Sequence, residues 1–238
     1  MSFSYTLFKV KLLPVLPFLM AEATSIRNTK PKLPSMAENL TLGQNPNSVL
    51  VLGESTVAGV GASEPKFSMA GRFFQLFEKN VQIKNIGKNG LLAKNAIQLL
   101  ENNLNGSGLN FTGSFIFLGA NDCFKLTHPQ VYRNQLKELL ELLKQKHGSN
   151  WIYLADIPPV HLFPVFSERM KRLLQIQRTY LQAEMRKLAE QNSEIIFDPI
   201  HLNISPEFFA ADGIHPSDLG YQKIAEFAWN GLKNRSLI

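Results

Sequence analysis

Residues 49–59 read VLVLGESTVAG, an apolar run of strand type that ends in a turn carrying Ser55. A short apolar run bounded by glycine is typical of a β-strand. Ligand sites of parallel α/β sheets gather at the carboxyl ends of the strands. The stretch therefore predicts that Ser55 lies at the functional edge of such a sheet.

The rest of the chain alternates strand and helix patterns. Further apolar runs of strand type follow the first one (48–52), at 81–86, 115–118, 151–157 and 194–197. Helical periodicity is found at 67–79, 92–103, 129–147, 167–191 and 216–232. Strand and helix in alternation favour parallel βαβ units with right-handed crossovers. We therefore expect one three-layer α/β/α sandwich, with the apolar stripe of 167–191 packed on the sheet.

Composition limits the class of protein. The 238 residues suit one domain, and 45% apolar with 18% charged residues are typical of a soluble globular chain. The formal net charge is +6, but no long basic run and no basic strip with interleaved aromatic residues is present. We expect a solvated basic surface and no nucleic-acid partner. With Cys123 as its one cysteine, the chain forms no internal disulfide and no cysteine zinc cluster.

The first 47 residues leave several possibilities open. Lys9 and Lys11 precede an apolar stretch, 12–20, and Ala21-Glu22-Ala23 has the form of a secretory cleavage site. Two prolines interrupt this stretch, which is too short to span a bilayer. Export, attachment to a membrane surface through residues 9–20, and a cytoplasmic location stay equally open. Residues 26–47 are polar and proline-rich, which predicts a surface linker before a domain over 48–238.

A second group of residues near the carboxyl end complements Ser55. Asp212 and His215 are three residues apart in DGIHP, directly before the last helical pattern, with Pro216 expected at its first position. A serine hydroxyl becomes a good nucleophile when a histidine takes its proton and a carboxylate orients that histidine. Three-residue spacing lets the carboxylate reach the imidazole on one turn. These residues predict a serine hydrolase.

Two more segments follow strands of their own. Gly90 lies in NIGKNG after the second strand, and Asn121 lies in GAND after the third. A glycine lets the backbone approach a ligand with its N–H, and an asparagine amide is a neutral donor suited to an oxyanion. Taken alone, the glycine segment is better explained as an ordinary loop, and the asparagine segment is equally compatible with a turn at the end of the strand.

Taken in this order, the four segments resemble those of the SGNH, or GDSL-type, hydrolase family. The resemblance runs from about residue 48 to 229 and places the nucleophile at Ser55 and the Asp-x-x-His pair at Asp212 and His215. It implies an oxyanion hole formed by Ser55, Gly90 and Asn121. One departure is Glu54, which stands where the family usually has aspartate. The Gly-x-Ser-x-Gly elbow of α/β-hydrolases is absent, because Val57 replaces its second glycine.

The resemblance implies a flavodoxin-like sheet of five parallel strands in the order 2-1-3-4-5. It also implies hydrolysis of small-molecule or lipid-like esters, acetyl or longer acyl, without metal or organic cofactor. An acyltransferase that uses the same serine and a catalytically silent binding domain are the alternatives. The loop 157–166 either lines an acyl pocket for a medium chain or only packs over the sheet. The sequence does not indicate the oligomeric state.

Overall fold

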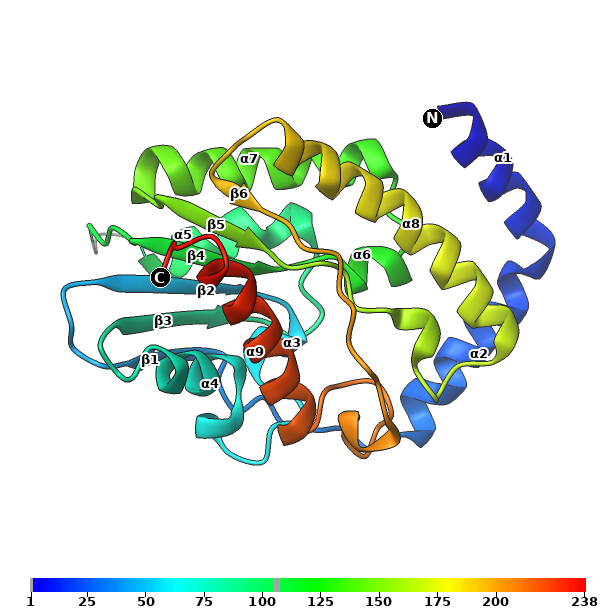
Figure 1. Cartoon of the computed structure of the whole chain (residues 1–238). Helices are drawn as coiled ribbons and strands as arrows, with labels where there is room; N and C mark the ends of the chain where they lie inside the picture. The colour runs from blue at the N-terminus through cyan, green and yellow to red at the C-terminus, as the bar shows by residue number, and fades with distance from the viewer. Residues whose placement is uncertain (1, 105–107) are drawn as a thin grey trace.

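The computed structural model describes residues 2–104 and 108–238. A central sheet has helices on both faces, and its strands follow the order β1-β3-β2-β4-β5-β6 (Figure 1). The strands are β1 (Asn39–Leu42), β2 (Ser48–Gly53), β3 (Gln82–Gly87), β4 (Gly113–Phe117), β5 (Trp151–Leu154) and β6 (Ile195–Ile196). The predicted three-layer α/β/α sandwich is confirmed.

The strand order of the five parallel strands is also the predicted one. Strands β3, β2, β4, β5 and β6 pair in parallel, which is the order 2-1-3-4-5 once β1 is set aside. The prediction of a plain linker over 26–47 is wrong at β1, which pairs with β3 in antiparallel orientation. Leu40 and Leu42 alternate with exposed residues and pack at the edge of the core. Four residues are too short a period-two pattern to stand out in a polar segment.

Five helices lie close to the predicted patterns, whereas the helices within residues 2–29 and at 120–124 were not predicted. The helices are α1 (Ser2–Leu12), α2 (Leu16–Thr29), α3 (Ser55–Ala58), α4 (Met69–Leu76), α5 (Ala96–Leu104), α6 (Ala120–Phe124), α7 (Pro129–His147), α8 (Glu168–Glu190) and α9 (Asp218–Lys233). Among the five predicted helices, α9 does not begin at the residue expected for its first position. Pro216 precedes the helix, and the Ser217 hydroxyl caps it by accepting from the Gly220 N–H at 3.3 Å.

Alternate residues of the central strand β2 point to two separate cores. Leu50 and Leu52 pack with α5, α7 and α8 on one face of the sheet, whereas Val49 and Val51 pack with α4 and α9 on the other. All four side chains are at most 2% exposed. A strand that is apolar at every position is stable only where both of its faces are buried. This requirement explains why β2 lies in the interior of the sheet and not at its edge.

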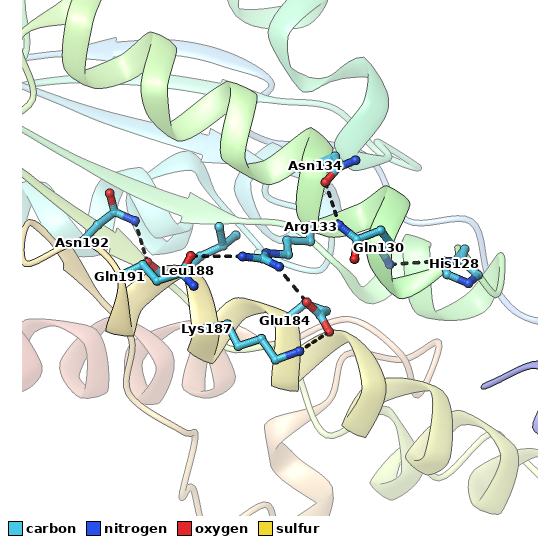
Figure 2. Close-up of polar contacts among 9 residues, drawn as sticks. All are labelled: His128, Gln130, Arg133, Asn134, Glu184, Lys187, Leu188, Gln191 and Asn192. Atoms are coloured by element: carbon cyan, nitrogen blue, oxygen red, sulfur yellow. Dashed lines mark hydrogen bonds and ion pairs between the residues drawn. The ribbon is translucent and has the colours of Figure 1, made fainter. Parts of the chain in front are cut away.

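Polar contacts join α7 and α8 along the outer layer (Figure 2). Arg133 of α7 donates to Gln191 at 3.0 Å and lies 3.8 Å from the buried carboxylate of Glu184 on α8. Lys187 donates to the same carboxylate at 2.7 Å. Two cations beside one buried carboxylate reduce the penalty of burying its charge, so α8 is held in register against α7.

Before β1 the chain forms an N-terminal arm, residues 2–29, in which α1 and α2 are joined by one 3₁₀ turn (Leu13–Val15). The arm, drawn in blue at one side of Figure 1, runs beside α8. Leu12 and Leu19 are buried in the core that α8 shares. Tyr180, on the α8 stripe expected against the sheet, instead stacks edge-on against Tyr5 of α1. None of the helices within the described residues is both long and apolar enough to cross a membrane.

Candidate active site

Ser55 is the first residue of α3, directly beyond the carboxyl end of β2. The side chain is half-buried. The turn is tight, because the Val57 and Ala58 N–H groups both donate to the Glu54 carbonyl at 2.9 Å. Gly59 ends α3 in the left-handed conformation, with φ 77°. The serine therefore opens a short helical turn at the carboxyl end of a strand, as the sequence predicts.

The neighbouring strand β3 fixes the position of α3. Buried Asn85 donates through its amide to the carbonyls of Val57, at 2.9 Å, and Ala37. A Cβ on Gly87 would overlap the backbone nitrogen of Ala58. Only a glycine allows so close an approach between strand and helix, so the last residue of β3 sets the distance between them.

Asp212 and His215 form a direct pair in the loop before α9. Asp212 Oδ2 lies 2.5 Å from His215 Nδ1, and Asp212 Oδ1 accepts from the Ile214 and His215 N–H groups at 2.9 and 3.0 Å. Burial by itself would raise the pKa of Asp212, but the hydrogen bonds from His215 and Ile214 outweigh it and hold that pKa below its usual range. A charged carboxylate on Nδ1 orients the imidazole and leaves its Nε2 as the nitrogen that can take a proton.

The segment that follows α3 packs against this loop. A Cβ on Gly61 would overlap the Pro216 carbonyl oxygen and would lie 3.2 Å from His215 Cβ. The helix that follows the loop contacts the same segment, since the Tyr221 hydroxyl of α9 donates to the Val60 carbonyl at 2.9 Å. Gly61, six residues after Ser55, thus touches the His215 loop. This contact brings the amino and carboxyl ends of the fold together at one edge of the sheet.

Glu54 organises the opposite side of the site. Its Oε1 accepts from the Ala120 N–H at 2.9 Å, and its Oε2 accepts from the Asn121 N–H at 3.0 Å and from Asn121 Nδ2 at 2.6 Å. One side chain beside Ser55 therefore fixes both the start of α6 and the rotamer of Asn121. A primary amide has two N–H bonds, so this contact occupies one and leaves the second for another acceptor.

The ionisation of Glu54 is strongly perturbed. Burial raises its pKa to about 7, against the opposing effect of the hydrogen bonds from Asn121 and Ala120, and the nearby charge of Asp122 adds to the rise. The side chain is only 3% exposed. Burial of a carboxylate that has no cationic partner among the described residues thus brings its pKa close to neutral pH, although three N–H donors oppose the rise.

Asp122 connects the segment of Asn121 to the segment of Gly90. Its Oδ2 accepts from the Ala93 N–H at 2.9 Å and its Oδ1 from the Thr127 hydroxyl at 2.8 Å. Ala93 follows the turn that contains Gly90, so Asp122 ties that turn to α6. Gly90 itself is exposed with φ 76°, and no atom lies within 4 Å of the place a Cβ would take. The backbone at Gly90 is thus open to a ligand.

The predicted residues are brought together to different degrees. Ser55, Gly90 and Asn121 follow the carboxyl ends of β2, β3 and β4, three adjacent strands, and Asp212 pairs with His215 as expected. No hydrogen bond joins the hydroxyl of Ser55 to His215 among the described residues. Glu54 and Asp122, which position the site, were not predicted in these roles.

The described part of the chain holds no cluster of three or more His, Cys, Asp or Glu side chains suited to a metal ion. Its one cysteine, Cys123 on α6, is buried, and burial raises the pKa of the thiol far above its usual range. The thiol is therefore not a nucleophile of this site.

Comparison with known proteins identifies the family. The model of the GDSL-like lipase/acylhydrolase family matches residues 51–223, which include all five predicted site residues. The chain belongs to the GDSL-like lipase/acylhydrolase family, and the resemblance drawn from the sequence motifs is confirmed. A search of curated protein sequences returned no match.

Solved structures of this family share the fold. The chain aligns with TesA at TM-score 0.64 and 18% identity, covering 81% of this chain and 100% of TesA. A lipase/acylhydrolase from Enterococcus faecalis aligns at 0.61 and 18% identity, over 79% and 96% of the two chains. A putative arylesterase from Agrobacterium tumefaciens aligns at 0.62 and 17% identity, over 81% and 100%. At this level of identity the likeness concerns the fold, and the substrate of this chain is a separate question.

The contact at Gly61 predicts a substitution that moves the His215 loop. We expect Gly61→Ala to lower the rate of ester hydrolysis by about tenfold or more, because its φ of 95° and the Pro216 carbonyl both exclude a Cβ. Gly148→Ala is the matched control: it places a Cβ at φ 66°, away from the site, with its nearest neighbours at 3.7 Å. An equal loss of activity in both variants would contradict a specific effect on the loop.

Glu54 predicts a pH-dependent stability. Its folded pKa of about 7 exceeds the ordinary 4.5, so the folded state binds the proton more tightly than the unfolded chain. The resulting stabilisation is complete below the unfolded pKa and disappears as the pH rises through the folded one. Between roughly pH 4 and 8, the free energy of unfolding should fall by about 3 kcal/mol more in the wild type than in Glu54→Gln.

Urea unfolding of both proteins across this pH range measures the difference. Glu138→Gln, at an exposed position of α7, controls for replacing a carboxyl with an amide. Parallel pH profiles for the wild type and Glu54→Gln would show that Glu54 does not titrate in this window.

Proposed function

We propose that the protein is a serine esterase that hydrolyses carboxylic esters through Ser55, His215 and Asp212. The observation that carries the proposal is the Asp212–His215 pair, 2.5 Å apart, in a loop packed against the segment that follows Ser55. Family membership supports an ester hydrolase. The hydroxyl and the imidazole reach hydrogen-bond distance in the substrate complex, where such contacts tighten.

The reaction proceeds through an acyl-enzyme. His215 Nε2 takes the Ser55 proton while Ser55 Oγ bonds to the ester carbonyl carbon, which gives a tetrahedral oxyanion. When the carbon–oxygen bond to the alcohol breaks, the alcohol leaves with the proton from His215. Water then attacks the acyl-enzyme by the same route, releases the acid and restores Ser55. Asp212 stabilises the imidazolium in both halves.

The oxyanion would be bound by the Ser55 and Gly90 N–H groups and by the second N–H of the Asn121 amide. These three groups follow adjacent strands, and the hydrogen bond to Glu54 fixes the rotamer of Asn121 before substrate binds. Donors held in place in this way need no reorganisation during the reaction. Each is typically worth about 3 kcal/mol, or a hundredfold or more in rate.

An apolar cavity of about 260 Å³ beside the site suits an acyl chain. Phe124 lines it three residues after Asn121 on α6, and Ile214 lines it next to His215. Phe166, at the end of the loop 157–166, lines it as well, which favours the first of the two interpretations of that loop. The remaining lining residues are Leu126, just after α6, and residues of α2 and α8: Leu16, Leu19, Met20, Ala23, Met170, Leu173 and Leu174.

The nucleophile is tested with a fluorophosphonate probe and a p-nitrophenyl ester. The wild type should be labelled at Ser55, and Ser55→Ala should lose the label and at least about a thousandfold in rate, because the acyl-enzyme cannot form. Ser193→Ala, an exposed serine just before the amino end of β6, should keep both. Hydrolysis at the wild-type rate by Ser55→Ala would refute the proposal.

The cavity predicts a preference for medium acyl chains. We expect kcat/KM to rise several-fold from p-nitrophenyl acetate to butyrate and hexanoate, because each methylene moved from water into the cavity contributes about 0.8 kcal/mol at most. Leu173→Trp, which fills the cavity, should remove this rise and leave acetate hydrolysis in place. Ile176→Trp is the control, since Ile176 lies on the same helix but is 45% exposed. Preference for acetate in the wild type would exclude the cavity as the acyl site.

A further inference from the structure

The N-terminal arm carries a concentration of exposed apolar side chains. Within the described residues, twelve large apolar side chains are exposed, and five of them fall between residues 7 and 20. These are Leu7 at 45%, Val10 at 55%, Leu13 at 64%, Phe18 at 66% and Met20 at 62% exposed. Such a cluster on one short segment marks an interaction surface more often than chance exposure does.

Helix α1 is apolar on two opposite sides. Tyr5 and Leu12, two turns apart, are buried against the body of the protein, at 2% and 6% exposed. Leu7 and Val10, which are three residues apart and therefore adjacent on the helix surface, face solvent. The apolar residues of the inner side are needed to pack the helix on the body of the protein. Those of the outer side contribute nothing to this packing.

Polar contacts on the inner side hold the arm in place. The Tyr5 hydroxyl lies 3.0 Å from both the Leu126 carbonyl and Gln177 Oε1. Glu22 of α2 accepts from the N–H and the hydroxyl of Ser167, the N-cap of α8, each at 2.7 Å. The outer side is therefore presented on an anchored element, with no rearrangement needed to expose it.

Positive charge is concentrated in the arm and the three residues that follow it. Residues 2–32 contain five basic side chains (Lys9, Lys11, Arg27, Lys30 and Lys32) and one acidic side chain, Glu22. This net charge of +4 is most of the formal +6 of the whole chain. Lys9 and Lys11 flank Val10 on α1, and both are exposed. The basic residues are thus less evenly scattered than the sequence suggests at first sight.

We propose that the outer side of the N-terminal arm (Leu7, Lys9, Val10, Lys11, Leu13, Phe18 and Met20) docks on an anionic lipid surface. Apolar side chains enter the boundary between head groups and acyl chains, while lysines keep their charge at the level of the head groups. A second copy of the chain fits less well, because a symmetric contact through this surface would bring four lysines into one interface with no acidic side chain among the residues of the surface.

The position of the proposed acyl cavity agrees with such docking. Met20 is 62% exposed and also lines the cavity, together with Leu16 and Leu19 of α2. The cavity therefore borders the surface that would meet the lipid. Docking itself does not depend on the proposed esterase activity and is tested without it.

Sedimentation of the full-length protein with vesicles tests the proposal. The wild type should pellet with vesicles of phosphatidylcholine and phosphatidylglycerol, and less with phosphatidylcholine alone. Leu13→Glu/Phe18→Glu should lower the partition coefficient about tenfold or more. Leu219→Glu/Leu237→Glu, which adds the same charges at exposed apolar positions elsewhere, should lower it far less. Circular dichroism at rising temperature confirms that each variant is folded.

The charge contribution is tested separately. Lys9→Gln/Lys11→Gln should weaken binding to the anionic vesicles several-fold and make it less sensitive to salt. Wild-type protein that stays in the supernatant with both kinds of vesicle would overturn the proposal. So would wild-type dimers that do not bind vesicles and that Leu13→Glu/Phe18→Glu converts to monomers, because a second copy would then cover this surface.

Discussion

The carboxylate of Glu54 is the contact on which the candidate site depends. It lies between the ends of β2 and β4 and accepts from two backbone N–H groups and from the Asn121 amide. The Glu54 N–H in turn donates to the Phe117 carbonyl at 3.0 Å, so backbone and side chain both link these strands. Because Ser55 is the next residue, one buried group fixes the nucleophile and the amide donor relative to each other.

This arrangement has an energetic consequence. A buried carboxylate that lacks a cation loses much of its hydration, and hydrogen bonds from neutral donors only partly replace it. Aspartate, which the motif resemblance gives as the usual residue here, is one methylene shorter, whereas the Glu54 carboxylate accepts from the Ala120 and Asn121 N–H groups at the start of α6. The buried Glu54 carboxylate thus has two effects: it holds Asn121 in place, and its raised pKa makes it easy to protonate.

Much of the fold could be predicted because its elements have strong local patterns. The apolar run of β2 and the proline and glycine that bound α7 act within a few residues of sequence. The arm was harder, because Pro14 and Pro17 interrupt its apolar stretch and no helix was predicted there. In the structure both occupy the second position of a helical segment, where the missing N–H would have no helical partner. Strand β1 depends on pairing with β3, which no local pattern of four residues reveals.

In the site, too, contacts between residues close in sequence could be predicted, and contacts between distant residues could not. Asp212 and His215 interact across three residues, so their spacing predicted the pair. The functions of Glu54 and Asp122 depend on which backbone N–H groups meet their oxygens, from residues 29 to 67 positions away. A sequence displays the residue types of a site more readily than the contacts that position them.

The N-terminal arm lies outside the matched family region and yet is part of the core. Leu12 and Leu19 are buried with residues of α8, and α2 forms one wall of the apolar cavity. Polar side chains at the outer positions would leave those inner contacts intact and would interact better with water. Keeping Leu13 and Phe18 in solvent therefore lowers solubility without adding to the core. Such side chains are understandable if the arm has two surfaces with different partners, the body of the protein on one side and lipid on the other.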